Sequence, residues 1–270
     1  MVAKILKHII VNKTSGLFPP VIYMRYLEFI GLMLRCFGNK KALRRILRYG
    51  KNSFELVFFD QSRWRIVNHV RANRYLQGLD HAGERLYLRY GLDKISQDFE
   101  YLVDVGANVG ELARYFLERG KTVFCFEPDP IVFKLLAWNL KSYPNVMLFQ
   151  LGLDNTTGEK EFGLISETAD SSLIFQKGAK TILIKVTQFC ELEIARKLST
   201  NSVLKMDTEG NEPESLIGFG DTLKNFSFIA IDCGKERLGN STQIEVIQVL
   251  EQAGFKKIIL SNDLIVNSWR

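Results

Sequence analysis

The chain has 270 residues, 46% of them hydrophobic, and a net charge of +6. This length suffices for one α/β domain with an extension, and the hydrophobic content supports a packed core. The four cysteines lie far apart without a Cys-x-x-Cys pair and the three histidines are not clustered, which argues against a disulfide framework and against a histidine-based metal site and favours a reducing cytoplasm.

Residues 1 to about 50 are predicted to be helical, ending near Gly50. Lys4 and Lys7 interrupt the first apolar run and no small-residue cleavage site follows, so we expect no secretory signal. Residues 21–37 are apolar but contain three charged residues, too many for a membrane-spanning helix. This segment reads as a helix with one apolar face, which packs on the domain, forms a homo-oligomer contact or lies at a membrane surface.

Much of the positive charge is N-terminal. The basic residues concerned are Lys40, Lys41, Arg44, Arg45, Arg48, Arg63, Arg65, Arg71 and Arg74. They form either an ordinary solvated face or a surface that attracts lipid head groups, a nucleotide-sugar, a charged glycan or nucleic acid. We therefore expect a helical, basic extension over residues 1–80, a second domain over residues 81–270, and a cytoplasmic location with possible association at the inner membrane surface.

From residue 54 the chain predicts further elements. Residues 54–59 and 65–67 resemble a short hairpin, and residues 70–98 are polar. Strands and helices then alternate, which predicts a parallel sheet with right-handed crossovers. The segments are strand 101–105, helix 111–118, strand 122–126, helix 130–141, strand 146–151, antiparallel strands 159–165 and 182–186, helix 191–198, strand 203–206, a helix from Pro213, strand 228–231, helix 242–252 and a final hairpin 255–260 and 264–266.

The most informative stretch joins strand 101–105 to the following helix. Gly106 and Gly110 allow a tight turn close to a ligand, and the next strand ends at Glu127. In parallel α/β proteins, a nucleoside-type cofactor binds to a unit of this kind, which consists of a strand, a glycine loop, a helix, a second strand and an acid. The bland alternative is a strand-to-helix turn without a ligand.

The loop argues against a dinucleotide. Asn108 and Glu111 stand where a dinucleotide loop would have glycines, and a carboxylate at the helix start would repel a pyrophosphate. It is compatible with a ligand that carries an ammonium and a sulfonium. We therefore expect S-adenosylmethionine as the cofactor.

Four segments occur in order: residues 104–110 (DVGANVG), 126–129 (FEPD), 152–158 (GLDNTTG) and 205–212 (KMDTEGNE). Together they resemble the FkbM family of S-adenosylmethionine-dependent methyltransferases, over about residues 85–260. The resemblance implies a class I methyltransferase-like, Rossmann-like α/β fold whose seven-stranded sheet has an antiparallel last strand. It also implies O-methylation of a hydroxyl, often on a sugar of a glycan, glycolipid or natural product.

On this resemblance the cofactor would bind at the carboxyl ends of the strands. The residues concerned are Asp104, Gly106, Ala107, Asn108, Gly110, Glu111, Glu127, Pro128, Gly152, Leu153 and Asp154. Asp104 either accepts loop amides or meets the cofactor's ammonium; Asn108 and Glu111 would face the methionine portion and Glu127 the ribose. Phe126 or Pro128 would flank the adenine, with residues 152–154 near its edge.

Asp207 is our choice of general base, followed by Glu209 and Glu212. Lys205 is either part of the catalytic group or the ion-pair partner of a carboxylate. Paired acids of this kind can also hold Mg²⁺, which we do not favour because no dedicated ligand cluster is visible.

Acceptor candidates are few: Tyr87, Tyr90 and the loop 166–180 with Ser171 and Ser172. Two alternatives to a sugar methyltransferase remain. One is an RNA methyltransferase, although no aromatic-rich RNA-binding module is visible and nucleic acid is not the expected partner. The other is a membrane-peripheral binding protein with a decayed cofactor site.

Overall fold

The structure is a computed structural model that describes residues 19–96, 98–164, 171–175 and 179–270. It divides into two units, Met1–Ala82 and Gly83–Arg270. The division falls inside helix α3 (Leu79–Arg89). No helix among the described residues combines the length and the apolar character needed to cross a bilayer.

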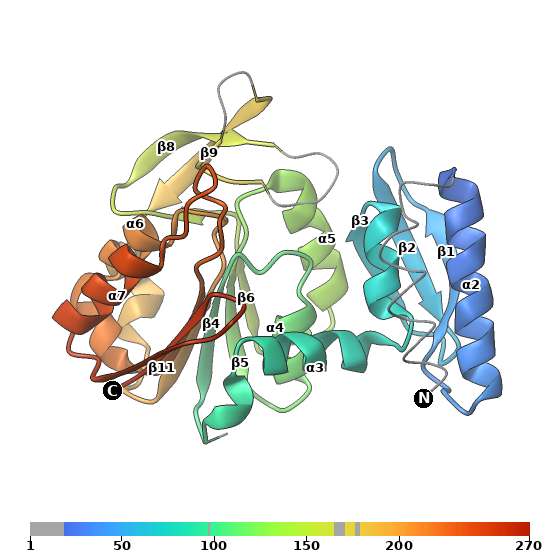
Figure 1. Ribbon diagram of the computed structural model, residues 1–270, viewed down its shortest axis with the longest axis horizontal. Coiled ribbons are helices and arrows are strands. Elements are labelled where there is room, and N and C mark those ends of the chain that lie inside the picture. The colour runs from blue at the N-terminus through green and yellow to red at the C-terminus, as the bar shows by residue number, and fades with distance from the viewer. Residues whose placement is uncertain (1–18, 97, 165–170, 176–178) are drawn as a thin grey trace. The chain divides into compact units, whose positions relative to one another are not determined.

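The first unit is a helix on a small antiparallel sheet. Helix α2 (Pro20–Cys36) precedes β1 (Leu43–Arg48), β2 (Ser53–Phe58) and β3 (Arg63–Val67), which pair in that order, and the turn η1 (His69–Tyr75) follows (Figure 1). Tyr23 and Leu27 of α2 are fully buried. The predicted hairpin of residues 54–59 and 65–67 is confirmed as β2 and β3.

The prediction of helix up to Gly50 is wrong over Leu43–Arg48, which form the edge strand β1. A register shift between Leu43 and Arg45 interrupts the pairing with β2. Its effect is that the buried residues Leu43 and Ile46 are three positions apart, a spacing that imitates a helix. The part of the helical prediction that covers residues 1–18 lies outside the described residues.

The second unit contains a seven-stranded sheet in the order β12-β13-β11-β10-β4-β5-β6. All neighbours pair in parallel except β13, which is antiparallel to both β11 and β12. The predicted sheet with an antiparallel last strand is thereby confirmed. The strands are β4 (Tyr101–Val105), β5 (Thr122–Phe126), β6 (Val146–Phe149), β10 (Ser202–Met206), β11 (Phe226–Asp232), β12 (Lys257–Leu260) and β13 (Ile265–Trp269).

Helices α4 (Glu111–Leu117) and α5 (Pro130–Leu140) cover one face of this sheet, and α6 (Glu212–Ile217) and α7 (Gln243–Gln252) cover the other (Figure 1). Asp129 is the N-cap of α5, and its carboxylate accepts the amides of Ile131 and Val132. Strands β5 and β6 lie on one side of β4, whereas β10 and β11 lie on its other side. The strand order therefore has a topological switch point between β4 and β10. Such a switch point leaves a crevice at the carboxyl ends of the strands.

A small sheet, β7-β9-β8, follows β6. It consists of β7 (Gly152–Leu153), β8 (Gly158–Gly163) and β9 (Thr181–Thr187), and the antiparallel pairing of β8 with β9 confirms the predicted insertion. The predicted α-helix 191–198 is wrong: this segment forms short 3₁₀ turns, η3 (Phe189–Glu191) and η4 (Glu193–Arg196), broken by the extended backbone of Leu192. The turns η2 (Leu92–Lys94) and η5 (Gly220–Asn225) complete the unit.

Candidate active site

The glycine loop after β4 is anchored to the ends of two neighbouring strands. The amides of Gly106 and Ala107 both donate to the carbonyl of Phe126 at 3.0 Å. Gly106 has φ +69°, and a Cβ at this position would lie 1.8 Å from the carbonyl oxygen of Asp207. Only glycine satisfies both demands, so the loop passes in direct contact with the segment that follows β10.

Glu127 lies at the carboxyl end of β5 and closes the loop from the other side. Its Oε2 accepts the amide of Asn108 at 2.9 Å and its Oε1 accepts the amide of Asp129 at 3.0 Å. Burial, helped by the charge of Asp129, raises the pKa of Glu127 to about 8, against the effect of the two amides. Each carboxylate oxygen keeps a further lone pair for a hydroxyl donor.

Asp104 and Lys205 form a buried ion pair between β4 and β10. Lys205 Nζ lies 3.0 Å from Asp104 Oδ1 and donates to the carbonyls of Val105 and Gly106. Burial raises the pKa of Asp104, although Lys205 opposes this; burial acts to lower the pKa of Lys205, but Asp104 and Asp207 outweigh it and the pKa is raised. Each side chain of the pair therefore favours the charged form of the other.

The sequence predicts two alternative roles for Asp104: accepting amides of the loop, or meeting the cofactor's ammonium. The contacts of its carboxylate bear on this choice. Apart from the ion pair with Lys205, neither carboxylate oxygen accepts a hydrogen bond from any residue that the structure describes. The loop amides go instead to Phe126 and Glu127. The carboxylate thus has acceptor capacity left for a cationic ligand group.

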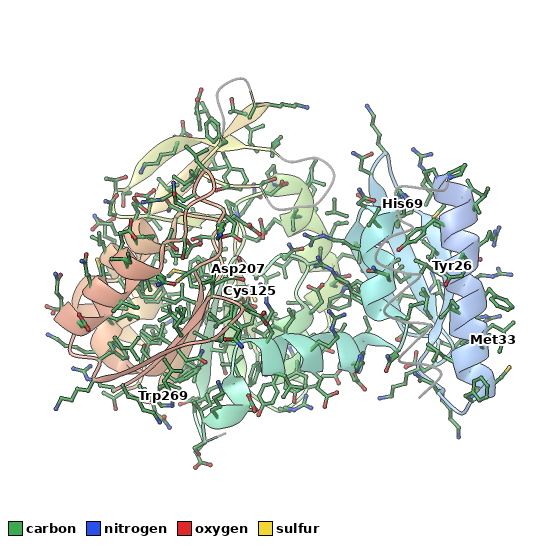
Figure 2. All side chains as sticks on the ribbon, viewed as in Figure 1. Tyr26, Met33, His69, Cys125, Asp207 and Trp269 are labelled. Carbon is green, nitrogen blue, oxygen red and sulfur yellow. The ribbon has the colours of Figure 1, made fainter. Side chains whose placement is uncertain are left out.

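Asp207 comes directly after β10, at the switch point (Figure 2). The hydroxyl of the buried Tyr90 donates to its Oδ2 at 2.7 Å. Burial and the charge of Asp207 raise the pKa of Tyr90 well above its usual range, so this phenol remains a donor. The hydrogen bond fixes one oxygen of the carboxylate and leaves the other available.

A further acid, Asp232, ends the adjacent strand β11. Its Oδ2 lies 2.5 Å from Arg89 and its Oδ1 accepts the amide of Gly234. Burial and the nearby charge of Asp207 raise the pKa of Asp232 to about 6, against the effect of Arg89. Four carboxylates therefore lie at or near the carboxyl ends of the neighbouring strands β5, β4, β10 and β11, the edge where open parallel sheets bind ligands.

A model of the methyltransferase FkbM domain matches residues 104–257. The chain belongs to the FkbM methyltransferase family. This confirms the family predicted from the four sequence segments. The match runs from Asp104 near the end of β4 to the first residue of β12, and so includes Asp104, Glu127, Asp207 and Asp232.

Three individual proteins to which the chain is similar share between 10% and 29% sequence identity with it. Hexuronic acid methyltransferase AglP of Haloferax volcanii is 29% identical over 155 residues, which are 57% of this chain and 63% of that protein. Fibrillarin of Aeropyrum pernix with bound S-adenosyl-L-methionine is 10% identical, with a TM-score of 0.41 over 85% of this chain and 99% of that one. A SAM-dependent methyltransferase of Aquifex aeolicus is 15% identical, with a TM-score of 0.41 over 69% and 87% of the two chains.

In this FkbM domain Glu212 organises the loop after β10 rather than facing the crevice. It is 1% exposed, and its Oε1 accepts the amides of Thr208 and Gly210 while its Oε2 accepts the hydroxyl of Thr242. Glu209 is half-buried with φ +55°, and its carbonyl accepts the hydroxyl of Ser172 at 2.5 Å. Of the three acids named as bases, Asp207 and Glu209 are half-buried and Glu212 is buried.

The residues predicted for the adenine edge belong to the small sheet. Asp154 is fully buried, and Lys160 Nζ lies 2.7 Å from its carboxylate. The carbonyl of Leu153 accepts the hydroxyl of Ser215. The Asp154 side chain and the Leu153 carbonyl are thus engaged by other residues of this unit.

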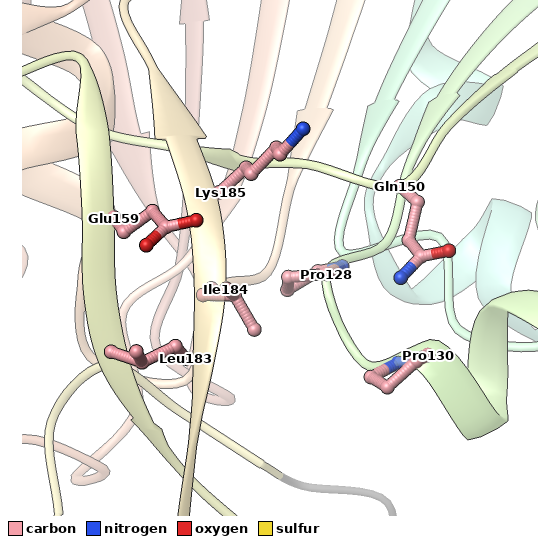
Figure 3. Close-up of a pocket in the computed structure, with 7 residues that line it drawn as sticks. All are labelled: Pro128, Pro130, Gln150, Glu159, Leu183, Ile184 and Lys185. Carbon is pink, nitrogen blue, oxygen red and sulfur yellow. The ribbon is translucent and has the colours of Figure 1, made fainter.

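A pocket of about 370 Å³ lies where the turn after β5 meets the small sheet (Figure 3). Pro128, Pro130 and Gln150 line one side of it. Leu183, Ile184, Lys185 and Glu159 line the other. Pro128 is therefore accessible beside the cofactor loop, whereas Phe126 is fully buried and stacks on Phe149.

The remaining predicted residues lie around the loop. Asn108 has φ +52° and its side chain accepts the amide of Val109; Gly110 caps α4 with φ +95°, and Glu111 is the first residue of that helix. Ser171 reaches Asp129 at 3.4 Å, so residues 171–172 bridge the segments after β5 and β10. Loop residues 165–170 and 176–178 lie outside the described residues.

Sequence reasoning missed Asp232 and Arg89. Glu127 was predicted because an acid at the carboxyl end of a buried strand lies at the ligand-binding edge of the sheet. Asp232 is the last residue of the buried strand 226–232, so the same rule would have found it. Arg89 has no local signal, because its partner is 143 positions away. Among the described residues, no three His, Cys, Asp or Glu side chains are grouped to hold a metal ion.

Proposed function

We propose that this chain is an S-adenosylmethionine-dependent O-methyltransferase that acts on a sugar hydroxyl of a glycan, glycolipid or natural product. The observation that carries the proposal is the glycine loop held between Glu127 and Asp207. Glu127 accepts a loop amide and would bind the ribose. The main chain of Asp207 contacts Gly106 of the loop, and its carboxylate would act as the base. Membership of the FkbM family supports methyl transfer, and the name of the Haloferax volcanii relative supports a sugar acid as one acceptor to test.

The residues present fit this cofactor. Apart from the ion pair of its Oδ1 with Lys205, the Asp104 carboxylate accepts no hydrogen bond from the described residues, and an acidic group of this kind suits an ammonium. Each Glu127 oxygen accepts one amide and can make a further hydrogen bond to a ribose hydroxyl, as acceptor or, where it carries the proton, as donor. Pro128 presents an apolar surface to a planar ring at the mouth of the pocket in Figure 3.

When bound, the cofactor supplies an electrophilic methyl group on a sulfonium. The part of the chain is to position and deprotonate the acceptor hydroxyl. Asp207 would accept the hydroxyl proton on the oxygen that Tyr90 leaves available, while the acceptor oxygen bonds to the methyl group and the methyl–sulfur bond breaks. Lys205 holds the carbonyls of Val105 and Gly106, and thereby fixes the loop against β10.

Calorimetric titration with S-adenosylmethionine and S-adenosylhomocysteine tests the cofactor. We expect micromolar binding that falls about tenfold to a hundredfold in Glu127→Ala and stays unchanged in Glu251→Ala, an exposed acid on α7. Absence of binding to either ligand in the wild-type protein would contradict the proposal.

A tritiated-methyl assay then identifies the acceptor. Hexuronic acids, neutral sugars and synthetic RNA are offered in parallel at equal concentration. We expect label in the sugars only, because residues 83–270 carry a net charge of −5 and so do not favour a polyanion. Label in RNA alone would replace the sugar acceptor by a nucleic acid.

A further inference from the structure

The side of α2 that faces away from the strands is apolar. Val21, Phe29 and Leu32 are 63%, 58% and 48% exposed, and helical spacing aligns them along one line. Ile22 and Met33 flank this line and are also exposed, and Figure 2 shows Met33 on the outer side of the helix. These five residues, together with Arg25 between them, are called the outer face of α2 below.

Against the described residues of its unit, α2 packs through the side opposite to the outer face. Tyr23 and Leu27 pack on the opposite side, and a Cβ on Gly31 would lie 1.8 Å from the carbonyl oxygen of Leu43, so helix and strand meet backbone to backbone. Glu28 accepts the amide of Ile46, a group that the edge strand would otherwise leave open. Soluble proteins rarely expose so continuous an apolar stripe unless it binds something.

The charge around this face is strongly positive. Residues 1–82 contain 15 of the 36 Lys and Arg but four of the 30 Asp and Glu, which gives a net charge of +11 against −5 for residues 83–270. Within α2 and the chain that follows it, the exposed basic residues are Arg25, Arg35, Lys40, Lys41, Arg44, Arg45 and Arg48. An anionic partner is therefore attracted to this unit and a cationic one is repelled.

We propose that the outer face of α2 docks on an anionic lipid surface, with the helix lying in the plane of the interface. Such a helix places its apolar side chains at the boundary of head groups and acyl chains, while neighbouring Lys and Arg interact with anionic lipids. A second copy of the chain suits this face less well, because it would bring two units of charge +11 together. The docking is independent of the methyl transfer proposed above.

Flotation of the full-length protein with lipid vesicles tests the proposal. We expect binding to phosphatidylcholine vesicles that contain about one third phosphatidylglycerol, and much weaker binding to pure phosphatidylcholine. Phe29→Glu/Leu32→Glu is expected to weaken binding to the anionic vesicles about a hundredfold. Ile244→Glu, at a 64% exposed position on α7, is the matched control and should bind as wild type.

A second pair of variants tests the charge without touching the apolar side chains. Arg44→Ala/Arg45→Ala should lower binding to anionic vesicles about tenfold or more and leave binding to neutral vesicles unchanged. Arg196→Ala/Lys197→Ala, an exposed pair in the other unit, should change neither. If the glutamate variant fails to fold in a thermal melt, this arginine pair decides the outcome.

Three results would overturn the proposal. The wild-type protein fails to bind anionic vesicles, or both test variants bind as well as wild type. Alternatively, sedimentation shows a dimer that Phe29→Glu/Leu32→Glu dissociates while no vesicle binding occurs, which would make the outer face an interface between copies. Cofactor titration in the same preparations keeps the failure of docking distinct from failure of the enzyme.

Discussion

The two units use charge in opposite ways. In Gly83–Arg270 the decisive carboxylates are buried and partnered: Asp104 with Lys205, and Asp232 with Arg89. In Met1–Ala82 the excess is cationic and exposed, as Arg44 and Arg45 on β1 show. A buried charge persists only where specific partners hold it, so it marks a defined site; exposed like charges act together over a surface. The chemistry and the placement of this protein are therefore expected to respond to different mutations.

The largest expected effect is on the chemistry. Asp207→Asn keeps the shape of the side chain but removes the proton acceptor, so the rate of methyl transfer should fall about a thousandfold. The dissociation constant for S-adenosylmethionine, measured by calorimetry, should stay within about twofold because the cofactor loop rests on Glu127. Asp221→Asn, an exposed carboxylate paired with Lys224, is the control. A rate unchanged in Asp207→Asn would remove Asp207 as the base.

The next effect concerns stability and pH. Because burial raises the pKa of Glu127 to about 8 from an ordinary value of 4.5, the folded state retains a proton that the unfolded state has released between these values. Stability should therefore fall as pH rises through this window, by about 1.4 kcal/mol per pH unit at most. Glu127→Gln, which does not titrate, should remove this loss in urea unfolding at pH 5.5 and 8. An identical pH dependence in wild type and variant would contradict the assignment.

A third change addresses the first unit. Gly31→Ala places a methyl group against the Leu43 carbonyl and should cost about 1–3 kcal/mol in the free energy of unfolding of that unit. Gly50→Ala, where the added Cβ meets nothing closer than 3.8 Å, should be nearly neutral. Cofactor binding should be the same in both variants. Loss of cofactor affinity in Gly31→Ala would show that the units do not act separately.

The smallest effect sharpens the role of Tyr90. Tyr90→Phe removes one hydrogen bond to Asp207, worth about 1 kcal/mol, so the rate should fall about fivefold. Tyr143→Phe, which loses an equivalent bond to Glu118 at the surface, should leave the rate unchanged. The dissociation constant for S-adenosylmethionine should stay as in wild type in both variants. A rate unchanged in Tyr90→Phe would contradict a role for this bond.

The sequence predicted the parts of the site that depend on neighbours along the chain. The run from β4 through Gly106 and Gly110 to Glu127 is local, since each element is adjacent in sequence to the next. The family resemblance placed the Asp207 segment beside them. The contacts that join these segments could not be predicted, because they connect residues far apart in the sequence. They are the contact of Gly106 with Asp207 and the hydrogen bond from Tyr90 to Asp207 across 117 positions.

The errors have physical causes too. In β1 a change of register gave a strand the spacing of a helix. At residues 191–198 the apolar spacing suited a helix. The backbone of Leu192 is extended, however, so the segment forms two short 3₁₀ turns instead. In both places tertiary packing decided between patterns that the residues alone leave nearly equal.

The absent side chain at Gly106 has a consequence for anyone who wishes to redesign this enzyme. Since the loop at Gly106 rests directly on the main chain of Asp207, the two segments behave as one mechanical part. Remodelling the loop to accept a bulkier cofactor analogue would shift the proton acceptor by a similar amount. Selection for a new methyl donor on this scaffold should therefore yield second mutations in residues 207–212 together with those in the loop.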